Sequence, residues 1–189
     1  RTDEPVNHVL PAWDHITGMS AAFGLLAAER HRHRTGSGQY VKIALLDVAL
    51  ATVGHMGMIA EVEVNDEDRA RHGNWLFGAF GRDFATRDGR RVMVVAITGR
   101  QWANLCAATN LHEAFASVAQ RLGLDLSREG DRFRGRDAIA ASLGPWIAAR
   151  DLKDVAELFR RHDVCFGVYQ SVRQLLTEDP EASVENPLF

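Results

Sequence analysis

Residues 80–98 read FGRDFATRDGRRVMVVAIT, a stretch that sets the architecture of the second half of the chain. Asp88-Gly89 lies between two apolar runs, which is the pattern of a β-hairpin because glycine accepts the positive φ that tight turns require. We therefore predict strands at 80–86 and 91–98. The uninterrupted apolar run 92–97 indicates that the second strand is well buried.

Amphipathic helices are predicted on the C-terminal side of this hairpin, where apolar residues recur at three- and four-residue steps. The predicted helices are 100–109, 114–122, 135–149 and 152–162, and a short strand follows at 164–168. This succession of a hairpin, helices and one further strand predicts a small α+β domain.

The N-terminal part of the chain has helical periodicity. Apolar residues over 16–26 form one stripe on a helix that we expect to run from about Asp14 into His31. Asp14 stands where an N-cap residue is expected. The basic run and the Thr-Gly-Ser-Gly breaker over 30–38 suit the end of this helix. A second helix is predicted from about Ile43.

The longest apolar stretch, 41–60, is long enough to cross a bilayer, but it carries Lys42, Asp47 and His55. Each of these residues is costly in hydrocarbon, so we predict a buried helix and no membrane partner.

The polar, charged segment 65–72 has no apolar period and is predicted to connect two domains. We place the first domain at 1–70, the small α+β domain at 71–170, and a linker that returns to the first domain at 171–189.

Composition narrows the function classes. The chain has 189 residues and a net charge of −3, which provides no broad basic surface for nucleic acid. Cys106 and Cys165 are far apart, which predicts buried thiols in a reducing, cytoplasmic compartment. The first residues, Arg-Thr-Asp-Glu, do not resemble a signal peptide.

Asp14, followed one helical turn later by Gly18, has two readings. Asp is among the best N-cap residues, and its replacement costs about 1 kcal/mol, so capping alone explains it. Alternatively, the helix dipole and free N–H groups keep the carboxylate ionised, and Gly18 allows a ligand to approach the backbone. Such a carboxylate could act as a nucleophile.

The histidines do not predict a metal site. His31 and His33 are two residues apart and point in different directions on a helix, whereas helical ligand pairs are three or four apart. The other histidines show neither an HExxH motif nor a Cys/His cluster. We therefore expect no bound metal.

The glycine–aromatic segment, residues 73–81 (GNWLFGAFG), precedes the first predicted strand. It is either an ordinary loop that packs its aromatic side chains into the small domain or a mobile lid whose glycines permit movement over a reactive intermediate.

Three motifs together resemble the central signature of the class III CoA transferases: PAWDHITG at 11–18, ERHRHRTGSGQ at 29–39 and VKIALLD at 41–47. The resemblance continues to 186–187 and covers nearly the whole chain. It implies an α/β fold, in which the helical part of a Rossmann-like large domain is followed by a small α+β domain. In that family a further N-terminal region supplies much of the CoA site, so the resemblance predicts no particular CoA-binding residue in this chain.

The resemblance also implies a mechanism. The aspartate that matches Asp14 attacks an acyl-CoA carbonyl to give a mixed anhydride, which the released CoA thiolate converts to an aspartyl-CoA thioester. An acceptor carboxylate reverses the sequence. Coenzyme A thioesters and carboxylic acids are then substrates, and no cofactor is bound permanently.

The family's glycine-rich lid matches the region of Gly78 and Gly81, although Ala79 and Phe80 separate these glycines, where some members have consecutive glycines. Phe77 and Phe80 suit a lid that retains a free acid between half-reactions. Residues 7–14 and 77–84 are most similar to a subgroup that moves CoA between the two carboxyl groups of one dicarboxylic acid.

Two alternatives remain open. A racemase of the α-methylacyl-CoA type shares the fold and uses the equivalent aspartate as a proton-transfer base. The chain could also be an inactive fragment that acts only as a dimerisation module, since members of the family form interlocked homodimers.

Overall fold

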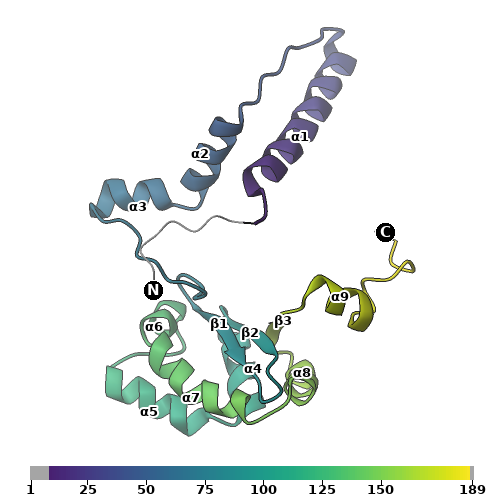
Figure 1. Ribbon diagram of the computed structural model, residues 1–189. Coiled ribbons are helices and arrows are strands. Elements are labelled where there is room, and N and C mark those ends of the chain that lie inside the picture. The colour runs from purple at the N-terminus through teal and green to yellow at the C-terminus, as the bar shows by residue number, and fades with distance from the viewer. Residues whose placement is uncertain (1–8, 188–189) are drawn as a thin grey trace. The chain divides into compact units, whose positions relative to one another are not determined.

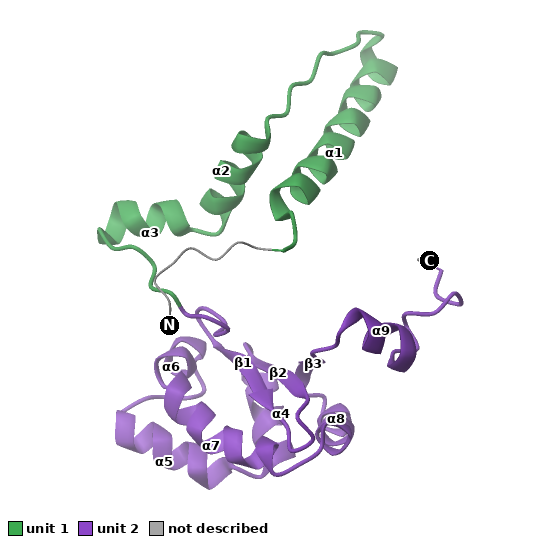
Figure 2. Ribbon diagram, viewed as in Figure 1, with its two compact units in different colours: residues 1–71 green, residues 72–189 purple. Residues whose placement is uncertain are grey.

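The computed structural model describes residues 9–187 of the chain. The chain divides into two compact units, which Figure 2 shows in separate colours. Unit 1 comprises residues 1–71 and unit 2 comprises residues 72–189.

Unit 1 is helical over its described residues, with α1 at Ala12–Thr35, α2 at Leu45–His55 and α3 at Met58–Asn65 (Figure 1). The segment between α1 and α2 runs back along α1. A Cβ built on Gly24 would lie 3.2 Å from Cδ1 of Ile43, so the absence of a side chain lets this segment approach the helix.

Two predictions for unit 1 are wrong. The helix begins at Ala12 with Pro11 at the N-cap, so Asp14 lies in the first turn and does not cap the helix. Proline suits this boundary because the first turn does not need its missing N–H. The predicted helix over 41–60 is divided at Gly57, whose φ of 75° turns the chain between α2 and α3.

The predicted burial of that helix is also wrong in this chain. None of the described residues of unit 1 is buried, because its three helices have few other surfaces to pack against. Over residues 9–187 no single helix combines the length and apolar character needed to cross a bilayer, and α2 with α3 meets that test only as a pair bent by 59°.

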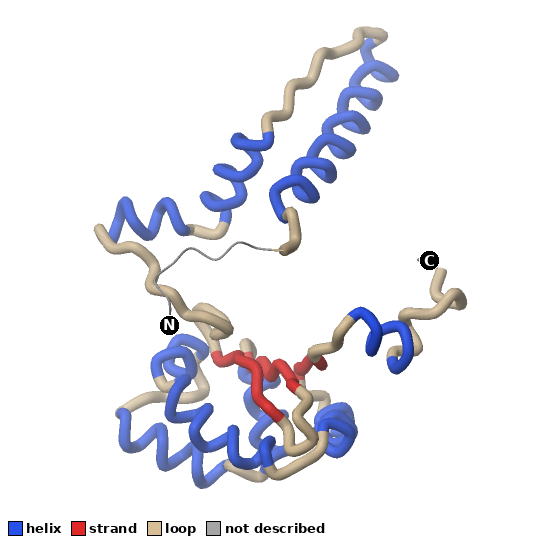
Figure 3. Tube along the Cα trace, viewed as in Figure 1, coloured by secondary structure: helices blue, strands red, loops and turns tan. Residues whose placement is uncertain are grey.

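Unit 2 contains a three-stranded antiparallel sheet in the order β1-β2-β3 (Figure 3). The strands are Phe80–Ala85, Arg91–Ala96 and Cys165–Val168. Gly89 has a φ of 76°, and its N–H donates to the carbonyl oxygen of Thr86 at 3.1 Å, which closes the hairpin. The predicted strands and the hairpin turn are confirmed to within two residues at each end.

Helices of unit 2 pack against this sheet (Figure 1). Those predicted from periodicity are confirmed, with small shifts at their ends: α4 Gly99–Thr109, α5 His112–Leu122, α7 Arg136–Ala148 and α8 Leu152–Arg161. Two short helices were not predicted: α6 Glu129–Arg134 and α9 Val172–Glu178. Neither is long enough to display a clear apolar period, and α9 is instead stabilised by a capping box between Ser171 and Gln174.

The core of unit 2 lies between one face of the sheet and the helices. Phe80, Val92 and Val94 from the strands are fully buried, as are Leu143 and Ile147 from α7. Such complete burial of branched and aromatic side chains supplies most of the stability of a domain of this size.

One buried cation joins the sheet to the helical layer. The guanidinium of Arg132 donates to the carbonyl oxygens of Leu126 and Ser127, each at 2.8 Å, and to that of Ala96 at 3.2 Å. Because a buried donor without partners is costly, these bonds make Arg132 a structural link rather than a free charge.

The burial of the two cysteine thiols agrees with the prediction for one and differs for the other. Cys106 is buried, and burial raises the pKa of its thiol to about 11. Cys165 is exposed, because it lies on the edge strand β3 with its side chain on the face that the helices leave open. The prediction that both thiols are buried is therefore wrong for Cys165.

Candidate active site

Asp14 is the third residue of α1, a helix of 24 residues, and its side chain is exposed. The first turn of a long helix carries partial positive charge from its aligned peptide dipoles and free N–H groups. Gly18 follows one turn later, and a Cβ built there would meet nothing within 4 Å. Asp14 therefore presents a carboxylate at the positive end of a helix, next to open backbone.

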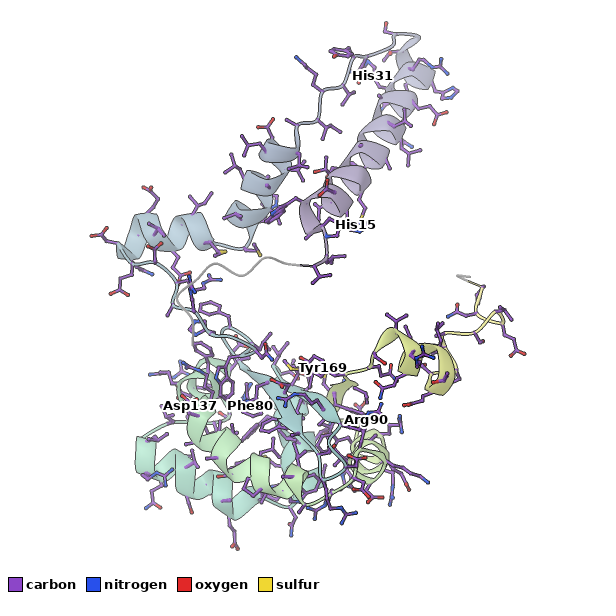
Figure 4. All side chains as sticks on the ribbon, viewed as in Figure 1. His15, His31, Phe80, Arg90, Asp137 and Tyr169 are labelled. Atoms are coloured by element: carbon purple, nitrogen blue, oxygen red, sulfur yellow. The ribbon has the colours of Figure 1, made fainter. Side chains whose placement is uncertain are left out.

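The cationic residues of α1 gather at its other end. Arg32, His33 and Arg34 occupy the last turn, where positive charge opposes the negative end of the dipole. Figure 4 shows His15 and His31 at opposite ends of the helix. His33 pairs with Glu29 at 3.5 Å on the exposed surface. Among residues 9–187, no group of three or more His, Cys, Asp or Glu side chains could hold a metal ion.

The glycine–aromatic segment lies in unit 2 and folds back against β1. The N–H of Leu76 donates to the carbonyl oxygen of Gly81 at 2.8 Å. Gly73 and Gly78 have φ values of 61° and 81°, a region that favours glycine. The segment therefore turns at Gly73 and Gly78, and Leu76 between these glycines is hydrogen-bonded to the strand.

The predicted lid residues occupy different environments. Phe80 and Gly81 are the first residues of β1, and the ring of Phe80 is fully buried beside Trp102 (Figure 4). Gly78 is at the turn, next to the exposed ring of Phe77. Phe77 in the turn is thus exposed, whereas Phe80 and Gly81 are buried at the base of the segment.

Aromatic and cationic side chains pack against the aromatic residues of the segment. The ring of Phe77 lies 5.4 Å from that of Phe133, and the guanidinium of Arg82 lies 4.6 Å from the centre of the Trp75 indole. Cation–π contacts of this kind contribute about 0.5–1 kcal/mol at partly exposed sites.

A buried carboxylate fixes the start of the segment, and the sequence reading missed it. Oδ1 of Asp83 accepts a hydrogen bond from the side-chain amide of Asn74 at 3.0 Å, and Oδ2 accepts from Nε of Arg91 at 2.7 Å. Burial alone raises the pKa of Asp83, but the bonds from Asn74 and Arg91 and the charge of Arg91 outweigh it, so the pKa lies below its ordinary value.

A sequence signal for Asp83 did exist. Along β1, Phe80 and Phe84 face the core, so Gly81 and Asp83 must face the other side of the sheet. A charged residue in the middle of a strand needs a partner, and Arg91 lies across the hairpin. That pairing becomes evident only when the register Ala85↔Arg91 is known.

The two parts of the predicted site lie in different units. Asp14 is in unit 1, and the glycine–aromatic segment is in unit 2. Lys42 and Asp47, which belong to the signature motifs, are exposed in unit 1.

Comparison with known proteins defines the class. The model of CoA-transferase family III matches residues 1–186, and the chain belongs to that family. It is 57% identical over 188 residues to a 2-methylfumaryl-CoA isomerase of Chloroflexus aurantiacus, a match that covers 100% of this chain and 46% of the isomerase. It is also 29% identical over 160 residues to a succinyl-CoA:mesaconate CoA-transferase of Haloarcula hispanica, covering 84% of this chain and 38% of that protein.

A solved structure agrees at the level of the fold. A hypothetical protein from Mycobacterium tuberculosis aligns with a TM-score of 0.70 at 21% identity, over 98% of this chain and 46% of that one. The chain thus spans less than half the length of these relatives. The prediction of a class III CoA transferase is confirmed, as is the similarity to 2-methylfumaryl-CoA isomerase.

Proposed function

We propose that the protein containing this chain moves CoA between the two carboxyl groups of one unsaturated dicarboxylic acid, as in the isomerisation of 2-methylfumaryl-CoA. The observation that carries this proposal is the 57% identity to a 2-methylfumaryl-CoA isomerase over the whole chain. Coenzyme A thioesters are then substrates, and nothing in the reaction requires a permanently bound cofactor.

Asp14 is the nucleophile in this proposal. Its carboxylate attacks the thioester carbonyl and expels the CoA thiolate, which leaves a mixed anhydride. The thiolate then attacks the Asp14 carbonyl carbon, forming the aspartyl-CoA thioester and releasing the substrate carboxylate. The second carboxyl group repeats both steps in reverse order, which restores Asp14. The assignment of Asp14 as the nucleophile is supported by its exposed position in the first turn of α1, where the helix dipole favours an anion.

The turn of the glycine–aromatic segment is the lid in this proposal, with Gly78 as its flexible point and Phe80 and Gly81 as its fixed base. A lid is required because water would hydrolyse the aspartyl-CoA thioester before the second carboxyl group attacks. We also propose that residues 1–70 belong to a Rossmann-like large domain to which 171–189 returns, and that the whole protein is a homodimer. The apolar side chains exposed on α1 support such additional contacts.

Trapping tests this proposal directly. The full-length protein is incubated with 2-methylfumaryl-CoA and hydroxylamine, and the intact mass and the peptide containing Asp14 are measured. A hydroxamate on Asp14 that is missing from an Asp14→Asn variant supports the covalent mechanism. 2-Methylfumaryl-CoA has no hydrogen on its α-carbon, so the racemase alternative is tested with a saturated 2-methylacyl-CoA in deuterated water. An unmodified Asp14, combined with exchange of the α-proton of that thioester for deuterium, would identify a racemase.

A further inference from the structure

Unit 2 contains two arginines that lie over aromatic rings. The guanidinium carbon of Arg82 is 4.6 Å from the centre of the Trp75 indole and 5.6 Å from the centre of the Phe84 ring. The guanidinium carbon of Arg136 is 4.2 Å from the centre of the Phe133 ring and 5.8 Å from that of Trp75. These five residues, which we call the arginine–aromatic cluster, bring two permanent positive charges to one indole.

Both arginines are partly buried between the sheet and a helix. Arg82 lies on β1 between Phe80 and Phe84, whose side chains face the core. Because side chains alternate along a strand, Arg82 faces the same helical layer. The helix α7, which begins with Arg136, packs against β1 (Figure 1). A cation in such a position loses part of its hydration, and proteins usually compensate this loss with a carboxylate.

No such carboxylate is found for either arginine. Among residues 9–187, neither Arg82 nor Arg136 forms an ion pair. Asp83, the neighbour of Arg82 in sequence, is paired with Arg91 instead. Asp137 follows Arg136 but is exposed and does not pair with it. The cluster therefore keeps two uncompensated positive charges on a chain whose net charge is −3.

The aromatic rings also leave the edges of the guanidinium groups available. A ring covers the face of a guanidinium, whereas hydrogen bonds form in its plane, at the N–H groups. Nε of Arg82 donates to the carbonyl oxygen of Asp83 at 3.3 Å, and Nη1 of Arg136 donates to that of Phe133 at 2.8 Å. Nε of Arg136 is buried and has no hydrogen-bond partner among the described residues. Both groups thus have hydrogen-bonding capacity that the described residues do not use.

We propose that the arginine–aromatic cluster binds a doubly charged oxyanion through the Nη groups of Arg82 and Arg136. Guanidinium groups match the oxygens of phosphate and carboxylate groups, and two guanidinium groups match a ligand with two negative charges. That ligand is either a phosphate group or a dicarboxylic acid that presents one carboxylate to each arginine. The site lies entirely in unit 2, and it does not depend on the chemistry proposed for Asp14.

The test measures anion binding to the full-length protein and three variants. Isothermal titration calorimetry follows sodium phosphate and, separately, sodium succinate, with sodium chloride holding the ionic strength constant. Arg82→Gln and Arg136→Gln each remove one guanidinium from the cluster. Arg150→Gln is the matched control, because Arg150 lies over a different indole, 4.0 Å from the centre of Trp146, and donates to its carbonyl oxygen.

Each cluster variant should weaken binding of the same anion by about tenfold or more, given the usual strength of hydrogen bonds to charged groups. Arg150→Gln should leave the affinity nearly unchanged. A second measurement uses only the wild-type protein, so it stays decisive where a variant does not fold. Phenylglyoxal modifies accessible arginines, and peptide mass spectrometry follows each of them. The bound anion should slow modification of Arg82 and Arg136 but not of Arg150.

A selective loss of phosphate binding in the cluster variants identifies a phosphate site, and a selective loss of succinate binding identifies a dicarboxylate site. Equal losses in all three variants would show a general effect of charge and overturn the proposal. A loss in only one cluster variant would also overturn it, as would unprotected Arg82 and Arg136 at high concentrations of both anions. The adduct at Asp14 tests the proposed function separately.

Discussion

The two units differ in how far they bury their apolar side chains, as one phenylalanine from each shows. Phe80 in unit 2 is completely buried, whereas Phe23 on α1 of unit 1 is 76% exposed. The difference extends to every described residue of unit 1, none of which is buried, while unit 2 has a continuous core. Burying one large apolar side chain contributes about 1.5–3 kcal/mol, so unit 2 has a source of stability that unit 1 lacks within this chain.

The proposed nucleophile and the stable core therefore lie in different parts of the chain. Unit 2 packs its own apolar residues, as a domain that folds alone must do. Unit 1 carries Asp14 on a helix whose apolar side chains face outward. Its order should therefore depend on further contacts, which a protein about twice this length, as its relatives are, can provide.

The largest expected effect concerns chemistry in unit 1. Asp14→Asn in the full-length protein should lower turnover of 2-methylfumaryl-CoA by more than about a thousandfold, because the amide cannot serve as the nucleophile. Stability should remain nearly unchanged, since the carboxylate is exposed and does not cap α1. Steady-state kinetics and thermal unfolding together check this, and a variant that keeps a tenth of the activity would remove Asp14 from the mechanism.

The next effect compares two leucines on helices. Leu143 on α7 is fully buried and Leu26 on α1 is 62% exposed. In the 189-residue chain, Leu143→Ala should lower the free energy of unfolding of unit 2 by about 2–5 kcal/mol, and Leu26→Ala should change stability by less than about 0.5 kcal/mol. Urea unfolding followed by circular dichroism measures both.

A large loss from Leu26→Ala would contradict the difference between the units, because it would show that unit 1 buries its apolar stripe, for example by self-association. The same substitution is also made in the full-length protein. There we expect a larger loss, because the proposed large domain would cover α1.

The features that the sequence predicted correctly depend on neighbouring residues. Asp88-Gly89 and the apolar run after it define the hairpin locally, because the turn needs only a glycine and the strand only its own burial. The signature around Asp14 is likewise contiguous. Sequence reasoning therefore identified the family and most elements of unit 2 without knowledge of packing.

The features that it missed depend on tertiary contacts or on weak local signals. The Asp83 anchor requires the register that brings Arg91 across the hairpin, and the exposure of Cys165 requires that β3 be an edge strand. The shift of the helix start to Ala12 reflects a choice among adjacent caps, which is the least determined feature of a helix. The expected burial of α2 presumed packing partners that the described residues of unit 1 do not provide.

A smaller effect concerns the pH dependence of the stability that the buried charge of Asp83 contributes to unit 2. The pKa of Asp83 is lowered in the folded protein, so its ionised form adds stability above the unfolded pKa of about 4. That contribution is lost as pH falls through the lower folded value. The difference in free energy of unfolding between wild type and Asp83→Asn should thus be larger at pH 6.5 than at pH 2.5. Equal differences at both pH values would show that Asp83 does not act through its charge.

The smallest effect returns to unit 1 and tests how open its surface is. Glu29 and His33 face each other across one turn of α1, and both are exposed. An exposed pair of this spacing contributes about 0.3–0.5 kcal/mol at most, since water and salt screen it. Glu29→Gln should therefore change the helical stability of the 189-residue chain by less than that amount, with no difference in 0.5 M salt. A loss above about 1 kcal/mol would require that the pair is shielded from water. This surface of α1 would then be covered in the 189-residue chain, which contradicts the exposure described for unit 1.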